Sequence, residues 1–429
     1  MASNPRVELL TLGDELLLGI RENAHLMHIG SELARHGLDL QRNQSFSDKI
    51  EDIERFFRDS WEQADIVITT GGLGPTVDDN TREVVADVLG LELNFVPAIE
   101  ADIRARFARL GREMSENNLK QCYLPEGAEL IPNPYGTAPG IWLEKDGKYL
   151  AMMPGPSAEL YPMLKEHVIP RLCSNGLCNI GEAYLQIRTM GVGESGLENT
   201  LRPIFNQHPG LGLAYCAHQG LVDVRLSRGK GDYSRAALQG IAKECREALG
   251  EDFVCYGNDT LAKVVFDHLR ADEKTLAVAE SCTGGLLSNA FTDIPGASKV
   301  FTGGIVCYNN DAKMELLGVP EDILAQHGAV SAETAVAMAT GAAERMSADY
   351  ALSVTGFAGP SGGTPENPVG TIYIGYHAPA GSWCVRMMYP GERTAVKTRA
   401  VNRALDVMRR KLNKYKVEDA MAALMHEAR

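Results

Sequence analysis

The stretch TLAVAESCTGGLLSNAFTDI, residues 275–294, places an apolar run directly before a serine, a cysteine, a threonine and two glycines. A short apolar run that ends at turn residues is typical of a buried strand, and the apolar spacing that follows predicts a helix. Strand, turn and helix in this order form the repeating unit of a parallel α/β sheet. The stretch therefore predicts an α/β fold and places polar side chains where a strand meets a helix.

The same unit recurs near the start of the chain. The apolar runs VELLTLG (7–13) and ADIVITTGG (64–72) alternate with the helix-period stretches NAHLMHIGSELARHG (23–37) and NTREVVADVLG (80–90). Asn80 with Glu83 predicts a capped helix start, and Gly90 predicts its end. Asp146-Gly147 between two strand-like runs predicts a tight hairpin at one edge of the sheet.

We therefore predict two separate three-layer α/β domains with mainly parallel sheets, joined by a small α+β domain. The boundaries that we assign are 1–172, 173–257 and 258–429, and the stretch SNGLCNIGE (174–182) is a candidate linker. The middle block reads as strand, helix, two strands and helix, without strict alternation, and we find no catalytic group of residues in it.

Composition limits the classes of function. The formal net charge is -14, the isoelectric point is near 5.3, and no basic run stands out, so a nucleic-acid partner is not expected. The N-terminus has no basic segment followed by a long apolar one, and no stretch approaches 18 uninterrupted apolar residues, which predicts a cytoplasmic protein without a membrane partner. The nine cysteines are odd in number and show no CxxC pattern, so we expect reduced thiols.

Three hydroxyl side chains in the last block fall at or just beyond the ends of predicted strands. They are Ser281, Tyr308 and Thr355. The carboxyl ends of parallel strands share one edge of a sheet, so these hydroxyls are expected to converge there. Lys313 follows near the start of a helix whose cap is Asn310 or Asp311, and its amine would approach the same edge.

Ser281 and Lys313 form a candidate serine–lysine dyad. A lysine desolvated among apolar walls can act as a neutral base and remove the proton of a serine hydroxyl. Tyr308 would relay or orient that proton, and the backbone N–H groups at Gly284 and Gly285 would form an oxyanion hole. Acyl transfer on an amide is the reaction that suits this set.

Simpler interpretations stay open for the same residues. Ser281 and Thr283 before two glycines are also ordinary capping residues, and Lys313 alone reads as a solvated surface lysine. Cys282 competes with Ser281 as a nucleophile, although no histidine lies near it in the sequence. The loop GFAGPSGGTPENPVG (356–370), with Gly356, Gly359 and Gly362, offers N–H groups to a phosphate or is a flexible surface loop.

These motifs resemble the conserved blocks of the CinA C-terminal family. The blocks are AESCTGG, FTGGIVCYNNDAKMELLGV, HGAVSAETAVAMATGA and SVTGFAGPSGGTPENPVGT. The resemblance implies a nicotinamide mononucleotide (NMN) deamidase that needs no cofactor, with Ser281 as nucleophile, Lys313 as base, and Tyr308 and Thr355 in the site. It also implies an arginine of the final helix near the substrate phosphate, which we assign to Arg399, with Arg393 and Arg403 as alternatives. Asn367 departs from the family pattern, where lysine is common, and puts the details of phosphate contact in doubt.

A second candidate site lies in the first block. TTGGLGPTVDDNTRE (69–83) follows a buried strand with a glycine-rich turn at Gly71, Gly72 and Gly74, then Thr76 and the pair Asp78 and Asp79. Asp14 and Glu15 follow the first strand. Such a turn can approach a phosphate, and adjacent carboxylates can hold Mg²⁺ or Mn²⁺ on a pyrophosphate. Asp14, Asp78 and Asp79 are equally well explained as helix caps.

The first block resembles the MoaB-like, molybdopterin-binding fold at the N-terminus of CinA proteins. The resemblance rests on GDELLLG, TTGGLGPTVDDNTRE, NPYGTAPG and MPGPSAEL. It implies an ADP-ribose pyrophosphatase that uses a divalent metal (Mg, Mn or Co). The middle block resembles the KH-type domain of full-length CinA, but its GVGES (191–195) is not the GxxG clamp of RNA-binding KH domains, so RNA binding is not inferred.

Together the resemblances imply a bifunctional pyridine-nucleotide salvage hydrolase. Its small-molecule substrates would be NMN and ADP-ribose, and full-length relatives suggest a homodimer. Two alternatives stay open: a molybdopterin-related N-terminal domain, and a competence-associated nucleotide-sensing scaffold with little turnover.

Overall fold

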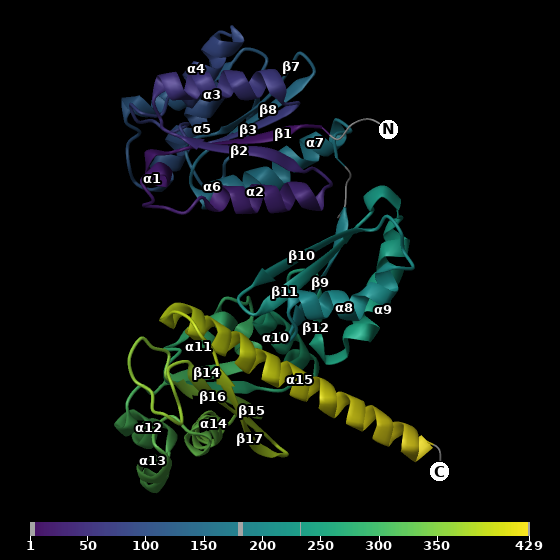
Figure 1. Ribbon diagram of the computed structural model, residues 1–429. Helices are drawn as coiled ribbons and strands as arrows, with labels where there is room; N and C mark the ends of the chain where they lie inside the picture. Colours follow the sequence, from purple (N-terminus) through teal and green to yellow (C-terminus); the bar gives the residue numbers. More distant parts are fainter. Residues whose placement is uncertain (1–4, 179–182, 232, 428–429) are drawn as a thin grey trace. The chain divides into compact units, whose positions relative to one another are not determined.

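The computed structural model describes residues 5–178, 183–231 and 233–427, and it divides into two compact units, one up to Tyr184 and one from Leu185 onward (Figure 1). Residues 179–182 of the candidate linker lie outside the described residues. The α/β fold class with several domains is confirmed, because both α/β regions carry sheets with parallel strands between helices.

The N-terminal unit is a six-stranded sheet with helices on both faces. Its main strand order is β2-β1-β3-β8-β7-β6. The first four of these strands are parallel to one another, and β7 pairs antiparallel with both β8 and β6. The elements are β1 (Val7–Leu12), α1 (Asp14–Leu17), α2 (Ala24–Arg35), β2 (Leu40–Phe46), α3 (Ile50–Gln63), β3 (Ile66–Thr70), α4 (Thr81–Leu89), β4 (Leu93–Phe95), α5 (Pro97–Arg109), η1 (Glu116–Cys122), β5 (Tyr123–Pro125), β6 (Glu129–Ile131), β7 (Gly140–Lys145), β8 (Lys148–Met153), α6 (Ser157–Met163), η2 (Leu164–Val168) and α7 (Ile169–Ser174).

Alternating residues of the central strands face two separate cores. Leu10 and Val67 pack with α3 and α4 on one face, whereas Leu9 and Ile68 pack with α2 and α6 on the other. This is the arrangement that a strand buried on both faces requires. The predicted hairpin at Asp146-Gly147 is confirmed, since both residues have positive φ and join β7 to β8.

Leu185 begins a second unit that holds both the middle domain and the last domain. The middle domain comprises β9 (Tyr184–Met190), α8 (Glu194–Phe205), β10 (Gly212–His218), β11 (Leu221–Ser227), η3 (Gly229–Gly231), α9 (Arg235–Leu249), η4 (Gly250–Asp252) and β12 (Phe253–Tyr256), with the sheet order β10-β11-β9-β12. The sequence pattern did not reveal β12, which is four residues long and antiparallel to β9.

The last domain is a five-stranded sheet of order β14-β13-β15-β16-β17, parallel from β14 to β15 and antiparallel beyond. Its elements are α10 (Leu261–Ala271), β13 (Leu276–Glu280), α11 (Leu286–Thr292), η5 (Ala297–Lys299), β14 (Phe301–Val306), α12 (Asn310–Leu317), α13 (Glu321–His327), α14 (Ala332–Met346), β15 (Tyr350–Gly356), β16 (Thr371–Ala378), β17 (Gly381–Met388) and α15 (Arg393–Glu427).

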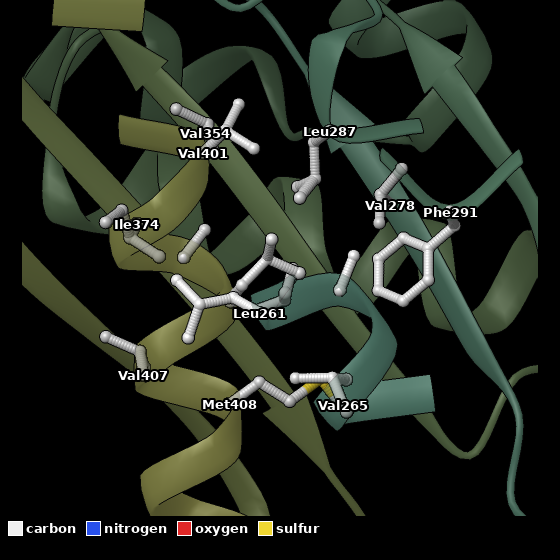
Figure 2. Packing of buried hydrophobic residues seen from close by; sticks show 14 of the residues in the cluster. Leu261, Val265, Val278, Leu287, Phe291, Val354, Ile374, Val401, Val407 and Met408 are labelled. Carbon is white, nitrogen blue, oxygen red and sulfur yellow. The ribbon is translucent and has the colours of Figure 1, made fainter. Parts of the chain in front are cut away.

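Two cores also sandwich this second sheet. Figure 2 shows Val278 and Val354 of the sheet packed with Leu261 of α10, Phe291 of α11 and Met408 of α15. Ala277 and Ala279, which point the opposite way from β13, pack with α12, α13 and α14. Small residues on that face let α14 lie close to the sheet.

Three expectations need correction. Asn80 does occupy the N-cap of α4 and Gly90 its left-handed end, but the Asn80 side chain makes no capping bond and donates to the Val77 carbonyl (2.9 Å) instead. The cap of α12 is Asn309, whose side chain accepts from the Ala312 N–H (2.8 Å), rather than Asn310 or Asp311.

The third correction concerns the cysteines. Cys173 and Cys178 form a disulfide, because α7 ends at Ser174 and the chain turns at Gly176, which brings the two Cα atoms to 4.5 Å. The other seven cysteines are free thiols. Among the residues that the structure describes, no helix combines the length and the apolar character needed to cross a membrane.

Candidate functional site

The carboxyl ends of β13, β14 and β15 lie at one edge of the second sheet because the three strands are parallel neighbours. Ser281 directly follows β13 and its N–H donates to the Val354 carbonyl of β15 (2.9 Å). Tyr308 lies two residues beyond β14, and Thr355 is the penultimate residue of β15. The predicted convergence of the three strand ends is therefore present in the fold.

Glu280 fixes the junction between β13 and α11. Its fully buried carboxylate accepts the N–H groups of Gly285 (2.9 Å), Leu287 (3.0 Å) and Ser288 (2.8 Å), and the Ser288 hydroxyl (2.7 Å). A carboxylate at a helix N-terminus satisfies N–H groups that otherwise lack partners, and it is favoured by the helix dipole. Gly304 of β14 leaves room for this arrangement, since a Cβ there would lie 2.0 Å from the Ser288 hydroxyl oxygen.

This network corrects the predicted oxyanion hole. The N–H of Gly285 already donates to Glu280, which removes it from the predicted pair of oxyanion donors and leaves Gly284. Both glycines have positive φ (62° and 100°), so their places in the turn depend on the absence of a side chain.

Lys313 is buried at the first turns of α12, with 1% of its surface exposed. Its Nζ lies 3.3 Å from the Ser281 Oγ, 3.0 Å from the Cys307 carbonyl oxygen, and 3.4 Å from those of Tyr308 and Asn309. The surface-lysine interpretation is thereby excluded, and the amine and the serine hydroxyl form the predicted pair.

Burial lowers the pKa of the Lys313 ammonium below its ordinary value. Desolvation penalises the charged form, and the N-terminal end of α12 adds positive potential from the helix dipole. The carbonyl oxygens work in the opposite direction, because they accept hydrogen bonds from the charged ammonium and so favour it. A neutral amine in this position has a lone pair that can accept the proton of Ser281.

Tyr308 and Thr355 do not reach this pair with their hydroxyls. The Tyr308 side chain is 64% exposed and its hydroxyl accepts from Arg393 (3.2 Å), while only its carbonyl contacts Lys313. The Thr355 hydroxyl is buried and donates to the Ala329 carbonyl (2.7 Å). The structure thus gives no support to the predicted proton relay through Tyr308, and it engages Thr355 in holding the loop before α14.

Cys282 is a poor nucleophile in this setting. Its thiol is 5% exposed, and burial raises its pKa to about 11, so little thiolate exists near neutral pH. His377 pairs with Ala351 at the start of β15, the opposite end of that strand from Thr355, and therefore does not approach the thiol. Thr283 is fully buried and its hydroxyl has no partner among the described residues.

Two cations of α15 border the 281–285 turn. Arg393 donates to the Gly359 carbonyl (2.7 Å) and to Tyr308, and Lys397 Nζ lies 3.8 Å from where a Cβ of Gly284 would stand. Both charges act on the Cys282 thiol. Arg399 instead donates to the Pro390 carbonyl (2.9 Å), and Arg403 pairs with Asp406 (2.7 Å). The geometry therefore favours Arg393, with Lys397, over our assignment of Arg399.

The 356–370 loop closes on itself and on the sheet. Gly370 donates to the Phe357 carbonyl (2.7 Å), and Asn367 accepts from the Tyr373 hydroxyl (2.8 Å). A Cβ at Gly356 would lie 2.6 Å from the Thr371 carbonyl oxygen, whereas Gly359 and Gly362 have positive φ. Asn367 thus braces the loop in place of the lysine expected from the family pattern.

A cavity of about 820 Å³ lies at the carboxyl edge of the N-terminal sheet. It is bounded by the turn of Gly71, Gly72 and Gly74 and by the carboxylates of Glu15, Asp48, Asp78 and Asp79. Thr76 and Asp14 do not line it. Asp79 accepts from the Thr76 N–H (2.9 Å) and hydroxyl, so it stabilises the turn as a capping residue would.

The carboxylates around this cavity act on one another. Burial, together with the negative charges of Asp14, Glu15 and Asp78, raises the pKa of Asp48, which also accepts from the Asp14 N–H (3.2 Å). An excess of negative charge of this kind favours a bound cation. Within the described parts of the chain, however, no three acidic, histidine or cysteine side chains come close enough together to hold a metal ion.

Sequence reasoning missed several residues of both sites. Their positions are Glu280, Lys397, His25, Asp48 and Gln121. Glu280 ends an apolar strand directly before Ser281, and Asp48 follows β2. Their positions at strand ends were the sequence feature that could have identified both as site residues. His25 and Gln121 line the N-terminal cavity; burial lowers the pKa of the His25 imidazole, and the fully buried Gln121 amide has no partner among the described residues. Lys397 and Gln121 carried no such signal.

Comparison with known proteins assigns each domain. Residues 8–174 match a family described as "Probable molybdopterin binding domain", residues 186–257 match "Damage-inducible protein CinA KH domain", and residues 258–412 match "CinA C-terminal domain". A protein of Caldanaerobacter subterraneus subsp. tengcongensis, whose name refers to competence-damage induction, is 40% identical over 95% of this chain and 98% of its own. The chain belongs to the CinA family.

Two further CinA relatives match nearly the whole chain and a part of it, respectively. The CinA-like protein of Dictyoglomus turgidum is 37% identical over 95% of this chain and 99% of its own. The solved structure of the competence/damage inducible protein CihA from Agrobacterium tumefaciens is 41% identical and covers 36% of this chain and 93% of that one, with a TM-score of 0.35. The predicted resemblance to full-length CinA, with its molybdopterin-binding-like, KH and C-terminal domains, is confirmed.

The role of Glu280 leads to a stability prediction for this CinA protein. Glu280→Gln places an amide NH₂ among four donors, and we expect the free energy of unfolding to fall by about 2 kcal/mol. Urea unfolding followed by circular dichroism measures the change. Glu315→Gln, at an exposed position of α12, is the matched control and should change stability by less than about 0.5 kcal/mol. Equal stability of both variants would show that Glu280 does not hold the junction.

Proposed function

We propose that the C-terminal domain is an NMN amidohydrolase, which converts NMN to nicotinate mononucleotide and ammonia without a cofactor. The observation that carries this proposal is the buried amine of Lys313 at 3.3 Å from the Ser281 hydroxyl. A serine with a neutral lysine as its base suits acyl transfer from an amide, and membership of the CinA C-terminal family favours this substrate.

In the first half of the reaction, neutral Lys313 accepts the Ser281 proton while the serine oxygen attacks the carboxamide carbon. The tetrahedral intermediate then collapses, Lys313 returns the proton to the departing nitrogen, and ammonia leaves an acyl-serine. In the second half, Lys313 takes a proton from water as the water oxygen attacks the ester carbon. The intermediate then collapses, Lys313 returns the proton to the departing serine oxygen, and nicotinate mononucleotide leaves the restored Ser281. Proton and electron pairs balance over the two halves.

Arg393 and Lys397 would hold the substrate phosphate in this scheme. Both belong to the first turns of α15 and border the 281–285 turn. The N-terminal end of the helix is the positive end of its dipole, so it adds to their attraction for a phosphate. Arg393 would exchange its bond with the Tyr308 hydroxyl for the phosphate. This assignment replaces Arg399.

The first test is ammonia release from NMN in the presence of a chelator. We expect the wild-type protein to release ammonia and Ser281→Ala to lose at least about a thousandfold of the rate. Cys282→Ala should retain activity, because its thiol is buried and protonated. Equal rates for wild type and Ser281→Ala, or loss only in Cys282→Ala, would refute Ser281 as the nucleophile.

The pH profile tests the base. Because the pKa of Lys313 is lowered and the neutral amine is the active form, kcat/KM should rise with pH up to the lowered pKa and level off above it, below the ordinary lysine value. Lys313→Arg keeps the charge but cannot release its proton at these pH values, and should lower the rate by about a hundredfold or more. A profile that is flat between pH 6 and 10 would contradict this role.

For the N-terminal domain we propose a metal-dependent ADP-ribose pyrophosphatase. The ring of carboxylates around the cavity and the glycine turn support it. Because no three of these side chains come together as a preformed metal site among the described residues, a divalent cation would arrive with the pyrophosphate and neutralise its charge. Glu15, Asp48 and Asp78 line the cavity and would each offer a single carboxylate to that cation. The backbone at Gly71 and Gly72 would approach the phosphates, and the neutral imidazole of His25 would accept a proton from the attacking water.

Asp48 separates this proposal from a purely structural role of the acidic residues. Asp48→Asn should lower Mn²⁺-dependent release of AMP from ADP-ribose by about a hundredfold or more, with unchanged thermal stability. Glu51→Gln, an exposed position of α3, is the control and should have no effect. AMP release that resists a chelator, or that Asp48→Asn leaves intact, would overturn the metal assignment.

Binding of a pterin without ADP-ribose turnover would support the molybdopterin-related alternative for this domain. NMN binding without ammonia release would support the nucleotide-sensing scaffold. The homodimer and the cytoplasmic location stay predictions.

A further inference from the structure

Two parts of helix α15 make different contacts. Its first turns carry Arg393 and Lys397 beside the 281–285 turn. About two and a half to five turns beyond Arg393, residues 402–410 contact the middle domain, which precedes the C-terminal domain in the chain. Figure 1 shows α15 as the long yellow helix of the second unit. One rigid element thus connects the candidate phosphate site to another domain.

The contact with the middle domain is organised by a fully buried carboxylate, that of Asp406. It accepts from Arg403 Nη1 (2.7 Å), from Arg409 Nη2 (2.5 Å) and Nε (3.1 Å), and from Arg410 Nε (2.9 Å). Arg409 is 1% exposed. A buried charge needs such partners, because an unpaired ion in the interior is strongly unfavourable. Asp406 therefore fixes the directions of Arg409 and Arg410.

These two arginines use their remaining donors on the middle domain. Arg409 donates to the carbonyls of Phe253 (2.7 Å) and Glu251 (2.8 Å) at the start of β12. Arg410 donates to the Met190 carbonyl (2.7 Å) at the end of β9 and to the Asp252 carboxylate (2.8 Å). The acceptors are largely backbone atoms, so they hold the helix in one register rather than supplying a general charge attraction.

Two further contacts restrict the helix. The Asn402 amide donates to the Gln219 carbonyl in the β10–β11 turn (3.1 Å). Met190, Leu221 and Val254 of the middle domain belong to the same apolar core as Val407 and Met408 of α15. The middle domain and α15 therefore share both a polar anchor and a hydrophobic core.

We propose that the middle domain positions α15 for the C-terminal site, with Arg409 and Arg410 as positioning residues for binding of the phosphate-bearing substrate. A slip of one residue along a helix moves a side chain by about 1.5 Å and rotates it by about 100°. Such a slip would take Arg393 away from Tyr308 and Gly359, and Lys397 away from Gly284. The choice of NMN as the substrate rests on the proposed amidohydrolase function, whereas the contacts between α15 and the middle domain do not depend on that proposal.

A merely structural anchor would give a different result. If Arg409 and Arg410 only stabilise the fold, their loss lowers the fraction of active protein and reduces turnover of every substrate equally. If they position Arg393 and Lys397, the loss falls on substrates that carry the phosphate. The nucleoside that corresponds to NMN without its phosphate distinguishes the two cases.

The experiment compares Arg410→Gln and Arg409→Lys with the wild type in the full-length protein. Arg410 is 20% exposed, so its variant folds even if Arg409 variants do not, and Arg409→Lys keeps the charge but loses the forked donors. Lys411→Gln removes a neighbouring charge that lies over Trp383 of the C-terminal domain, and serves as the control.

We expect KM for NMN to rise by about fivefold to thirtyfold in the Arg409 and Arg410 variants, with kcat within about twofold. Kinetic constants for the nucleoside should not change, and Lys411→Gln should match the wild type. Equal losses for NMN and the nucleoside, or unchanged KM for NMN in both variants, would overturn the positioning role.

Calorimetric titration with NMN in a Ser281→Ala background separates this inference from the proposed function. If the wild type releases no ammonia, the amidohydrolase proposal fails, and the titration alone decides the positioning role. An affinity for NMN that is about fivefold to thirtyfold weaker in the Ser281→Ala/Arg410→Gln protein than in the Ser281→Ala protein supports it. Equal affinities, or no binding of NMN to either protein, overturn it.

Discussion

The buried carboxylate of Glu280 is the interaction on which the geometry of the C-terminal site depends. It is the last residue of β13, and its four hydrogen bonds attach α11 to the strand. Ser281 is the next residue, so the position of its hydroxyl follows from this attachment. The turn from Ser281 to α11 contains Gly284 and Gly285, and its conformation depends on the positive φ of both glycines. Glu280 therefore determines where the candidate nucleophile lies, without touching a substrate.

Lys313 shows how the fold changes the chemistry of an ordinary side chain. Burial favours the neutral amine, and the three carbonyl oxygens around Nζ keep that amine in place. Those contacts need the chain to bend from β14 into α12 at Tyr308 and Asn309. The exposed Tyr308 side chain then has a separate role, as a partner of Arg393. The strand end thus supplies backbone atoms to the base and a side chain to the cation.

The N-terminal unit uses the same sheet edge with different chemistry. Its glycine turn is close to the ends of β1, β3 and β8, and carboxylates surround the cavity. Burial, and to a smaller extent the neighbouring negative charges, raise the pKa of Asp48 there. One acidic residue, Asp79, is committed to the turn itself. In both α/β domains the polar groups lie in the turns that follow the strands or at the start of the next helix. One edge gathers an amine and a hydroxyl, and the other gathers carboxylates.

The sequence by itself determined the α/β class, the alternation of strands and helices, and the strand ends at which Ser281, Tyr308 and Thr355 lie, because these depend on local hydrophobic period and turn residues. It also contained the motifs of the CinA family. Only the tertiary structure decided that Glu280 takes the N–H of Gly285, that Thr355 binds Ala329, and that Arg393 rather than Arg399 faces the 281–285 turn. These outcomes depend on which side chains meet across elements far apart in the chain, and on the direction in which each helix presents them. Helix periodicity places Arg393 and Arg399 on the same helix but does not reveal what packs against either one.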